Sequence, residues 1–128
     1  VMNWLIKSGE KTPLDINKGS VAWGNYKDVE FEYYTNTSKE TATKNLGSQT
    51  RIASGAYEGA KANNIYDLAG NVVKRTLEAG SSGSGVNRFS RGGSYGYDGT
   101  NYYASDRNDY YPYYSYDTFE FSGGLYIK

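Results

Sequence analysis

The sequence predicts a single small, loop-rich domain of the α+β or mostly β class, with N-terminal helices and long loops. Helical spacing of apolar residues and helix-end signals occur only within residues 1–19. Alternation along the chain, typical of strands, occurs at residues 29–34 and again near the C-terminal end. The 128 residues include 16 Gly and 15 Tyr, so we expect a small, partly aromatic core and many loops.

Two short helices are expected at the N-terminal end. Residues 1–8 place apolar side chains on one face, and Gly9 ends this segment. Thr12 can cap a second helix, with Pro13 in the first turn, where a missing N–H has no cost, and Gly19 at the end. We interpret both helices as packing elements.

The rest of the chain is predicted to consist of short strands and loops. Residues 29–34 predict a strand, and residues 35–50, rich in Thr, Ser, Asn and Lys, predict a long surface loop. Residues 79–85 (AGSSGSG) predict a flexible connection, and their similarity to a synthetic linker makes an engineered scaffold one interpretation. Residues 119–128 (FEFSGGLYIK) predict a terminal strand.

Charge and residue types exclude several classes of function. Lys+Arg and Asp+Glu both number 14 and are spread evenly, so no concentrated positive field attracts nucleic acid or anionic lipid. The chain has no Cys and no His, which removes disulfides, thiolate or imidazole metal sites and Ser-His-Asp triads. No stretch approaches the ~20 apolar residues of a membrane helix. We therefore expect no nucleic-acid partner, no membrane insertion and no cofactor.

Residues 95–119 form a Tyr-rich segment that predicts a binding surface. Nine of its 25 residues are Tyr, and most of the others are Asp, Asn, Ser, Gly and Thr. This is the composition of an antibody paratope, in which Tyr gives rigid contact area and small polar residues give adaptable hydrogen bonds. The alternative is low-complexity disorder. The predicted ligand-binding residues are Tyr95, Tyr97, Asp98, Asn101, Tyr102, Tyr103, Asn108, Asp109, Tyr110, Tyr111, Tyr113, Tyr114 and Tyr116.

Three blocks of sequence occur in a familiar order. They are NIYDLAGNV at residues 64–72, RGGSY at residues 91–95 and ASDR at residues 104–107. In this order they resemble the C-terminal half of the formylglycine-generating-enzyme-like family, whose fold is a variant of the C-type lectin. The resemblance implies one C-type-lectin-like domain over residues 1–128, with an α+β fold, a short antiparallel sheet, N-terminal helices and long loops. Its helical and loop part would be residues 1–62, and its part with the family pattern would be residues 63–128.

The departures from the family pattern limit what the resemblance implies. The family's Trp-Glu-Trp is Val73-Lys74-Arg75 here, and Lys74 argues against the calcium that the Glu helps to hold in some relatives. The namesake oxidation uses active-site cysteines that bind copper, and this chain has none. We expect no catalytic residue and no metal site. Family members have a longer N-terminal half, so a fragment, a trimmed scaffold, or completion by a partner chain or self-association are open interpretations.

The resemblance implies a non-enzymatic, receptor-binding or adhesion function. Some members of this fold family are the variable proteins of diversity-generating retroelements, in which a C-terminal segment is diversified on a fixed scaffold. Others are phage tail-associated or bacterial surface proteins that adhere to hosts. By this resemblance we expect a protein ligand or cell-surface receptor, and a location on a phage particle or a bacterial cell surface.

Two alternatives remain open on the sequence. One is a structural or assembly module of such a particle with no ligand of its own, which needs no special residue. The other is an enzyme built on the carboxylates within residues 98–120, as in glycoside hydrolases. We prefer the interpretation that these carboxylates solubilise a Tyr-rich surface.

Overall fold

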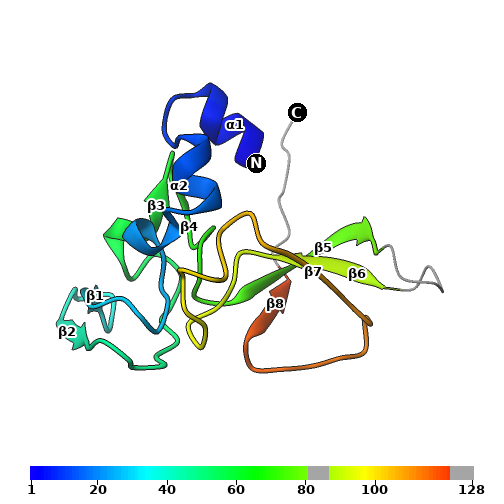
Figure 1. Cartoon of the computed structure of the whole chain (residues 1–128). Helices are drawn as coiled ribbons and strands as arrows, with labels where there is room; N and C mark the ends of the chain where they lie inside the picture. Colours follow the sequence, from blue (N-terminus) through cyan, green and yellow to red (C-terminus); the bar gives the residue numbers. More distant parts are fainter. Residues whose placement is uncertain (81–86, 122–128) are drawn as a thin grey trace.

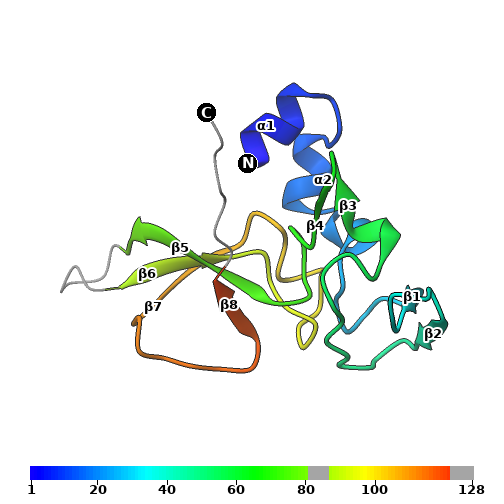
Figure 2. The ribbon, with the colours of Figure 1, turned by 180° about the vertical axis from the view of Figure 1, so that it is seen from behind.

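The computed structural model describes residues 1–80 and 87–121 and has an α+β architecture. Two helices and two small hairpins lie at one end of the molecule, and a four-stranded sheet extends from them (Figures 1 and 2). The helices are α1 (Met2–Lys7) and α2 (Pro13–Asn17), and single 3-10 turns follow at η1 (Ser20–Trp23) and η2 (Glu58–Ala60). The predicted α+β class is therefore confirmed.

Both predicted helices are present, and local chemistry sets their ends. After α1 the chain turns at Gly9, whose φ of 77° is a conformation that glycine adopts without strain. At the start of α2 the Thr12 hydroxyl accepts from the Asp15 N–H at 3.2 Å, and the Asp15 carboxylate accepts from the Thr12 N–H at 2.7 Å. These hydrogen bonds to Thr12 lower the pKa of Asp15.

The predicted loop at residues 35–50 is wrong in part, because it contains a strand. β1 (Phe31–Tyr34) pairs antiparallel with β2 (Thr41–Lys44), and Phe31 lies opposite Lys44. Lys44 is 2 % exposed and donates to the backbone carbonyls of Tyr26 at 2.7 Å and Val29 at 2.8 Å. A polar segment thus becomes a strand because its one buried cation finds backbone acceptors, a tertiary contact that local composition does not encode.

The main sheet is mixed, which corrects the predicted antiparallel sheet. Its strands are β5 (Val73–Ala79), β6 (Arg88–Arg91), β7 (Arg107–Tyr110) and β8 (Phe119–Phe121), in the order β7-β6-β5-β8. β6 pairs antiparallel with β5 and β7, whereas β8 pairs parallel with β5. A shorter hairpin joins β3 (Lys61–Ala62) to β4 (Ile65–Tyr66). Of the predicted flexible connection, residues 81–85 lie outside the described residues, as do residues 122–128 of the predicted terminal strand.

Tyr26 is the hub of the core. Its ring is fully buried, and its hydroxyl donates to the Gly92 carbonyl at 3.1 Å, which joins the N-terminal part of the chain to the turn after β6. A methyl group at Gly24, Gly93 or Gly99 would lie only 2.4–2.8 Å from this ring. Gly24, close to Tyr26 in the sequence, and the distant Gly93 and Gly99 therefore make room for one aromatic side chain. Leu5, Ile16 and Trp23 complete the same cluster.

The two glycine-containing blocks form turns that lie against other backbone segments, as their composition predicts. Gly70 has a φ of 66°, and a side chain there would lie 2.3 Å from the Asn25 carbonyl oxygen. Gly92 and Gly93 also have positive φ angles, and Gly92 carries the carbonyl that accepts from the Gly70 N–H at 2.6 Å. The turns at residues 70–71 and 92–93 therefore hold each other in place. They also align the start of β5 with the end of β6, which pair in the sheet.

Candidate functional site

A continuous series of aromatic rings runs over the connection between β7 and β8. Tyr111 lies 5.2 Å from Tyr113 and 5.8 Å from Tyr114, measured between ring centroids. Tyr113 and Tyr114 are 5.2 Å apart. The series continues from Tyr114 to Tyr116 at 6.0 Å and from Tyr116 to Phe119 at 5.5 Å. We call the surface made by Tyr97, Tyr102, Tyr110, Tyr111, Tyr113, Tyr114, Tyr116 and Phe119 the aromatic surface.

Arg75 on β5 holds this connection against the sheet. Its guanidinium donates to the backbone carbonyls of Pro112 at 2.9 Å, of Tyr111 at 3.4 Å and of Tyr114. The same group lies 4.8 Å from the centroid of the Phe119 ring. A planar fork of five N–H donors suits several carbonyls at once, which a lysine ammonium cannot match. The backbone of the loop is therefore fixed while its Tyr side chains face solvent.

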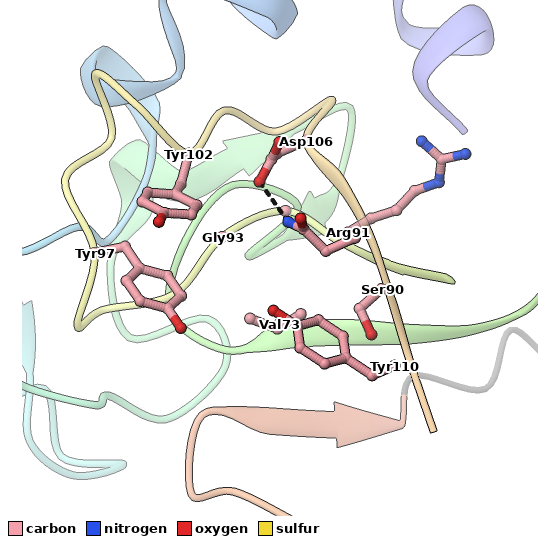
Figure 3. A pocket seen from close by; sticks show the side chains of 10 residues that line it. Val73, Ser90, Arg91, Gly93, Tyr97, Tyr102, Asp106 and Tyr110 are labelled. Carbon is pink, nitrogen blue, oxygen red and sulfur yellow. Dashed lines mark hydrogen bonds between the residues drawn. The ribbon is translucent and has the colours of Figure 1, made fainter. Parts of the chain in front are cut away.

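A narrow pocket lies between Tyr110 and the pair Tyr97 and Tyr102 of the aromatic surface (Figure 3). The rings of Tyr97 and Tyr102 stack at 4.3 Å and line the pocket together with Tyr110. The Asp106 carboxylate also lines it and accepts from the Asn108 amide at 2.9 Å. The hollow measures about 10 Å³, roughly the space of one water molecule, and opens to solvent. It suits the tip of one side chain of a partner rather than a whole small molecule.

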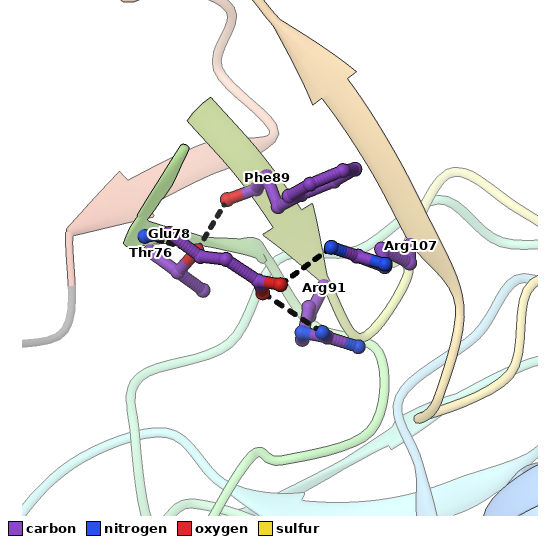
Figure 4. A network of polar contacts seen from close by, with 5 residues as sticks. All are labelled: Thr76, Glu78, Phe89, Arg91 and Arg107. Carbon is purple, nitrogen blue, oxygen red and sulfur yellow. Dashed lines mark hydrogen bonds and ion pairs between the residues drawn. The ribbon is translucent and has the colours of Figure 1, made fainter. Parts of the chain in front are cut away.

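A polar network on the other side of β6 fixes β7 beside the pocket (Figure 4). The Glu78 carboxylate accepts from Arg91 at 3.0 Å and from Arg107 at 2.5 Å. The Arg107 guanidinium also lies 3.5 Å from the centroid of the Phe89 ring. The hydrogen bonds and charges of the two arginines, Arg91 first, lower the pKa of Glu78. Figure 3 shows the Arg91 side chain directed away from the pocket, so its charge serves this network.

None of the nine predicted tyrosines is buried, and they differ in how far they are exposed. Six are exposed, from Tyr111 at 36 % to Tyr113 at 72 %, and the half-buried Tyr110 lines the pocket together with Tyr97 and Tyr102. Tyr95 and Tyr103 are half-buried and belong to neither ring series among the described contacts. The exposed tyrosines are Tyr97, Tyr102, Tyr111, Tyr113, Tyr114 and Tyr116.

The four predicted polar residues have different positions. Asn108 lies in the pocket beside Asp106. Asp98 forms an ion pair with Lys27 at 3.3 Å, and its backbone carbonyl accepts from the Asn101 N–H at 3.1 Å. Asp109 is half-buried on β7 and pairs with Phe89 of β6. Asn108 is therefore the polar residue of this set that lies at the pocket, and Asp98 holds the neighbouring turn.

Sequence reasoning missed Arg75, Asp106 and Phe119 as parts of the site. Arg75 stands where the family pattern has an aromatic residue, and that departure was the available signal. Asp106 lies inside the ASDR block, and Phe119 is the first residue of the predicted terminal strand. Arg107 lies in β7. The contact between Arg75 and Phe119 depends on the strand order, which places β8 beside β5.

Tyr110 brings a neutral hydroxyl group to the aromatic surface. Burial raises the pKa of the Tyr110 hydroxyl, with smaller contributions from Tyr97, Tyr102 and Asp106, so this hydroxyl stays protonated at neutral pH. Within residues 1–80 and 87–121, no three His, Cys, Asp or Glu side chains are grouped so that they could hold a metal ion. The described part of the chain also contains no helix long and apolar enough to cross a membrane.

Comparisons with known proteins give no relative for this chain. No protein-family model, no curated protein and no solved structure matches it.

Proposed function

We propose that this chain is a non-enzymatic binding domain that recognises a protein ligand or cell-surface receptor through its aromatic surface. The observation that carries the proposal is the set of six exposed tyrosines, of which Tyr111, Tyr113 and Tyr114 lie on a backbone segment that Arg75 fixes. An exposed aromatic patch with polar tips marks an interaction site in a soluble protein. Tyr is also enriched among the residues that dominate binding energy at interfaces.

The fixed backbone supports recognition rather than simple solubility. Ordering a loop on binding costs free energy, so a loop that is already held loses less on association. The Arg75 contacts hold the backbone at residues 111–114 and leave the side chains of Tyr113 and Tyr116 in solvent. The pocket beside Tyr110 adds a small hollow to the surface, with room for the tip of one partner side chain.

The resemblance of the three sequence blocks supports a finer proposal. The domain is a C-type-lectin-like scaffold related to formylglycine-generating-enzyme-like proteins, and its ligand-binding segment corresponds to the diversified segment of retroelement variable proteins. The turns at residues 70–71 and 92–93 fit a scaffold whose backbone contacts do not depend on the exposed loop. A phage tail or bacterial surface protein is the kind of protein in which such a domain adheres to a host.

A binding experiment tests the proposal with matched variants. The immobilised domain is exposed to detergent-solubilised bacterial envelope proteins, bound proteins are identified by mass spectrometry, and the affinity of each purified partner is measured. Tyr113→Ala and Tyr116→Ala should weaken binding by ~30-fold in at least one case. Trp4→Ala is the control, because Trp4 is 46 % exposed on α1. The proposal would be overturned if both Tyr variants bound the partner as tightly as the unmodified chain while Trp4→Ala lost binding.

A further inference from the structure

A second cavity lies far from the aromatic surface, between the β1–β2 hairpin and η2. Its volume is about 170 Å³, smaller than the site of a drug-sized molecule and large enough for a small organic ion. Its walls include three tyrosines and two glutamates, namely Glu32, Tyr33, Tyr34, Tyr57 and Glu58, with Gly59 beside them. Figures 1 and 2 both show the hairpin at the opposite end of the molecule from the β7–β8 connection.

The aromatic wall of this cavity is held in place by packing. The Tyr57 ring stacks on Phe31 with 3.9 Å between centroids, and Tyr33 meets Phe31 edge-on at 6.3 Å. Tyr57 also lies directly over Gly59, where a methyl group would come within 2.3 Å of its ring. The rings are therefore positioned before any ligand arrives, which reduces the entropy lost on binding.

The charge of the cavity favours a cation. Glu32 and Glu58 bring two carboxylates to its walls, and no described Lys or Arg lines it. The Tyr66 hydroxyl donates to the Glu58 carboxylate at 3.1 Å, which fixes that group and leaves its charge in place. The Tyr34 ring already attracts one cation of the chain itself, because the Lys39 ammonium lies 5.6 Å from its centroid.

We propose that this cavity binds a small organic ammonium ion, with a quaternary ammonium such as choline as its preferred ligand. Aromatic faces attract such a cation, and its alkyl groups lose their water against the rings. Carboxylates beside the rings add attraction and repel a ligand that carries phosphate next to the ammonium. The ligand is therefore the free organic cation rather than a phosphorylated headgroup.

Nuclear magnetic resonance titration of the full chain with choline chloride tests this assignment. Backbone shifts should saturate and map to residues 32–34 and 57–59. The neutral isostere 3,3-dimethylbutan-1-ol and phosphocholine should each bind at least about threefold more weakly. Glu58→Gln and Tyr34→Ala should weaken choline binding by about threefold or more, and Tyr34→Phe should preserve it. Lys39→Ala should strengthen it, because it removes a competing cation.

The controls separate this site from the aromatic surface. Tyr113→Ala should leave choline binding unchanged, and melting curves should show that Glu58→Gln is folded, since Glu58 is exposed. Equal affinity for choline and the neutral alcohol, equal affinity for phosphocholine, or shifts that stay outside residues 32–34 and 57–59 would each overturn the proposal. These results do not depend on the function proposed for the aromatic surface.

Discussion

The side-chain amide of Asn71 pairs with both backbone groups of Ile52. Its oxygen accepts from the Ile52 N–H at 3.2 Å, and its NH2 group donates to the Ile52 carbonyl at 3.0 Å. The same oxygen accepts from the Asn25 amide at 3.1 Å, and the Asn71 N–H donates to the Asn25 carbonyl at 2.7 Å. One buried side chain thus joins three segments, in the way that a neighbouring strand would.

Replacing Asn71 should therefore destabilise the fold strongly. Asn71→Ala would leave the buried N–H and carbonyl of Ile52 unpaired, at a cost of about 2–4 kcal/mol in the free energy of unfolding. Asn71 has a φ of 59°, so Asn71→Gly serves as a partner variant that removes the amide without backbone strain. Urea denaturation measures both. A loss below about 0.5 kcal/mol with Asn71→Gly would contradict the role of the amide.

Arg75→Lys should loosen the loop without unfolding the domain. Lysine keeps the charge but cannot donate to the Tyr111, Pro112 and Tyr114 carbonyls together. We expect faster amide hydrogen exchange in residues 111–118 and unchanged exchange in α1 and α2. Arg51→Lys is the control, because Arg51 is exposed. Unchanged exchange in residues 111–118 would show that Arg75 does not hold the loop.

Alkaline pH should destabilise the domain through Tyr26. Burial raises the pKa of its hydroxyl far above the ordinary value of 10.0, whereas in the unfolded chain it loses its proton near that value. The stability from the protonated hydroxyl is complete below pH 10 and declines as the pH rises above it. Burial also raises the pKa of Tyr57, which acts in the same direction, and lowers the pKa of Lys44, which acts oppositely.

Tyr26→Phe isolates the contribution of this hydroxyl. At pH 8 the variant should lose about 1 kcal/mol, because the hydrogen bond to the Gly92 carbonyl is removed. Between pH 9.5 and pH 11 its stability should decline less than that of the natural chain. Urea unfolding across this pH range gives both values, and parallel declines for the two chains would contradict the assignment.

Truncation of exposed tyrosines should leave stability almost unchanged. Tyr113 is 72 % and Tyr116 is 54 % exposed, so their replacement by Ala removes little buried area. We expect melting temperatures within about 2 °C of the natural chain. Calorimetry measures this, and Tyr26→Ala is the positive control for unfolding. A large loss in the first two variants would mean that these rings belong to the core.

Chelation should not lower the melting temperature. The described residues bring no three His, Cys, Asp or Glu side chains together, and Lys74 stands where the family pattern has an acidic residue. A bound ion would stabilise the native state by mass action, so its removal would lower the melting point. Scans with and without excess EDTA make the comparison. A drop of several degrees would reveal an ion that this reasoning misses.

The features that could be predicted from the sequence are those with local causes. The start of α2 follows from Thr12 and Pro13, and the turn at residues 70–71 follows from the tolerance of Gly and Asn for positive φ. β2 was missed because its stability depends on Lys44 reaching the carbonyls of Tyr26 and Val29, which its own residues do not reveal.

In the candidate site, too, the features with local causes could be predicted and those that depend on tertiary contacts could not. The exposure of the tyrosines follows from the number of hydroxyl groups that a core would have to pair. The contribution of Arg75 required knowledge that β8 lies parallel to β5, which brings Phe119 and residues 111–114 to its guanidinium. The C-type-lectin-like scaffold remains a prediction that the structure does not test.

The strand order also restricts how this domain can evolve. β7 and β8 both run parallel to β5 but occupy opposite edges of the sheet, about 14 Å apart. Residues 111–118 must cross that width and return along the strand, although such crossovers usually need about a dozen residues. Deletions there would pull β8 out of register, whereas substitutions of outward-facing tyrosines would not. Related domains would therefore differ in the amino-acid sequence of this loop and keep its length.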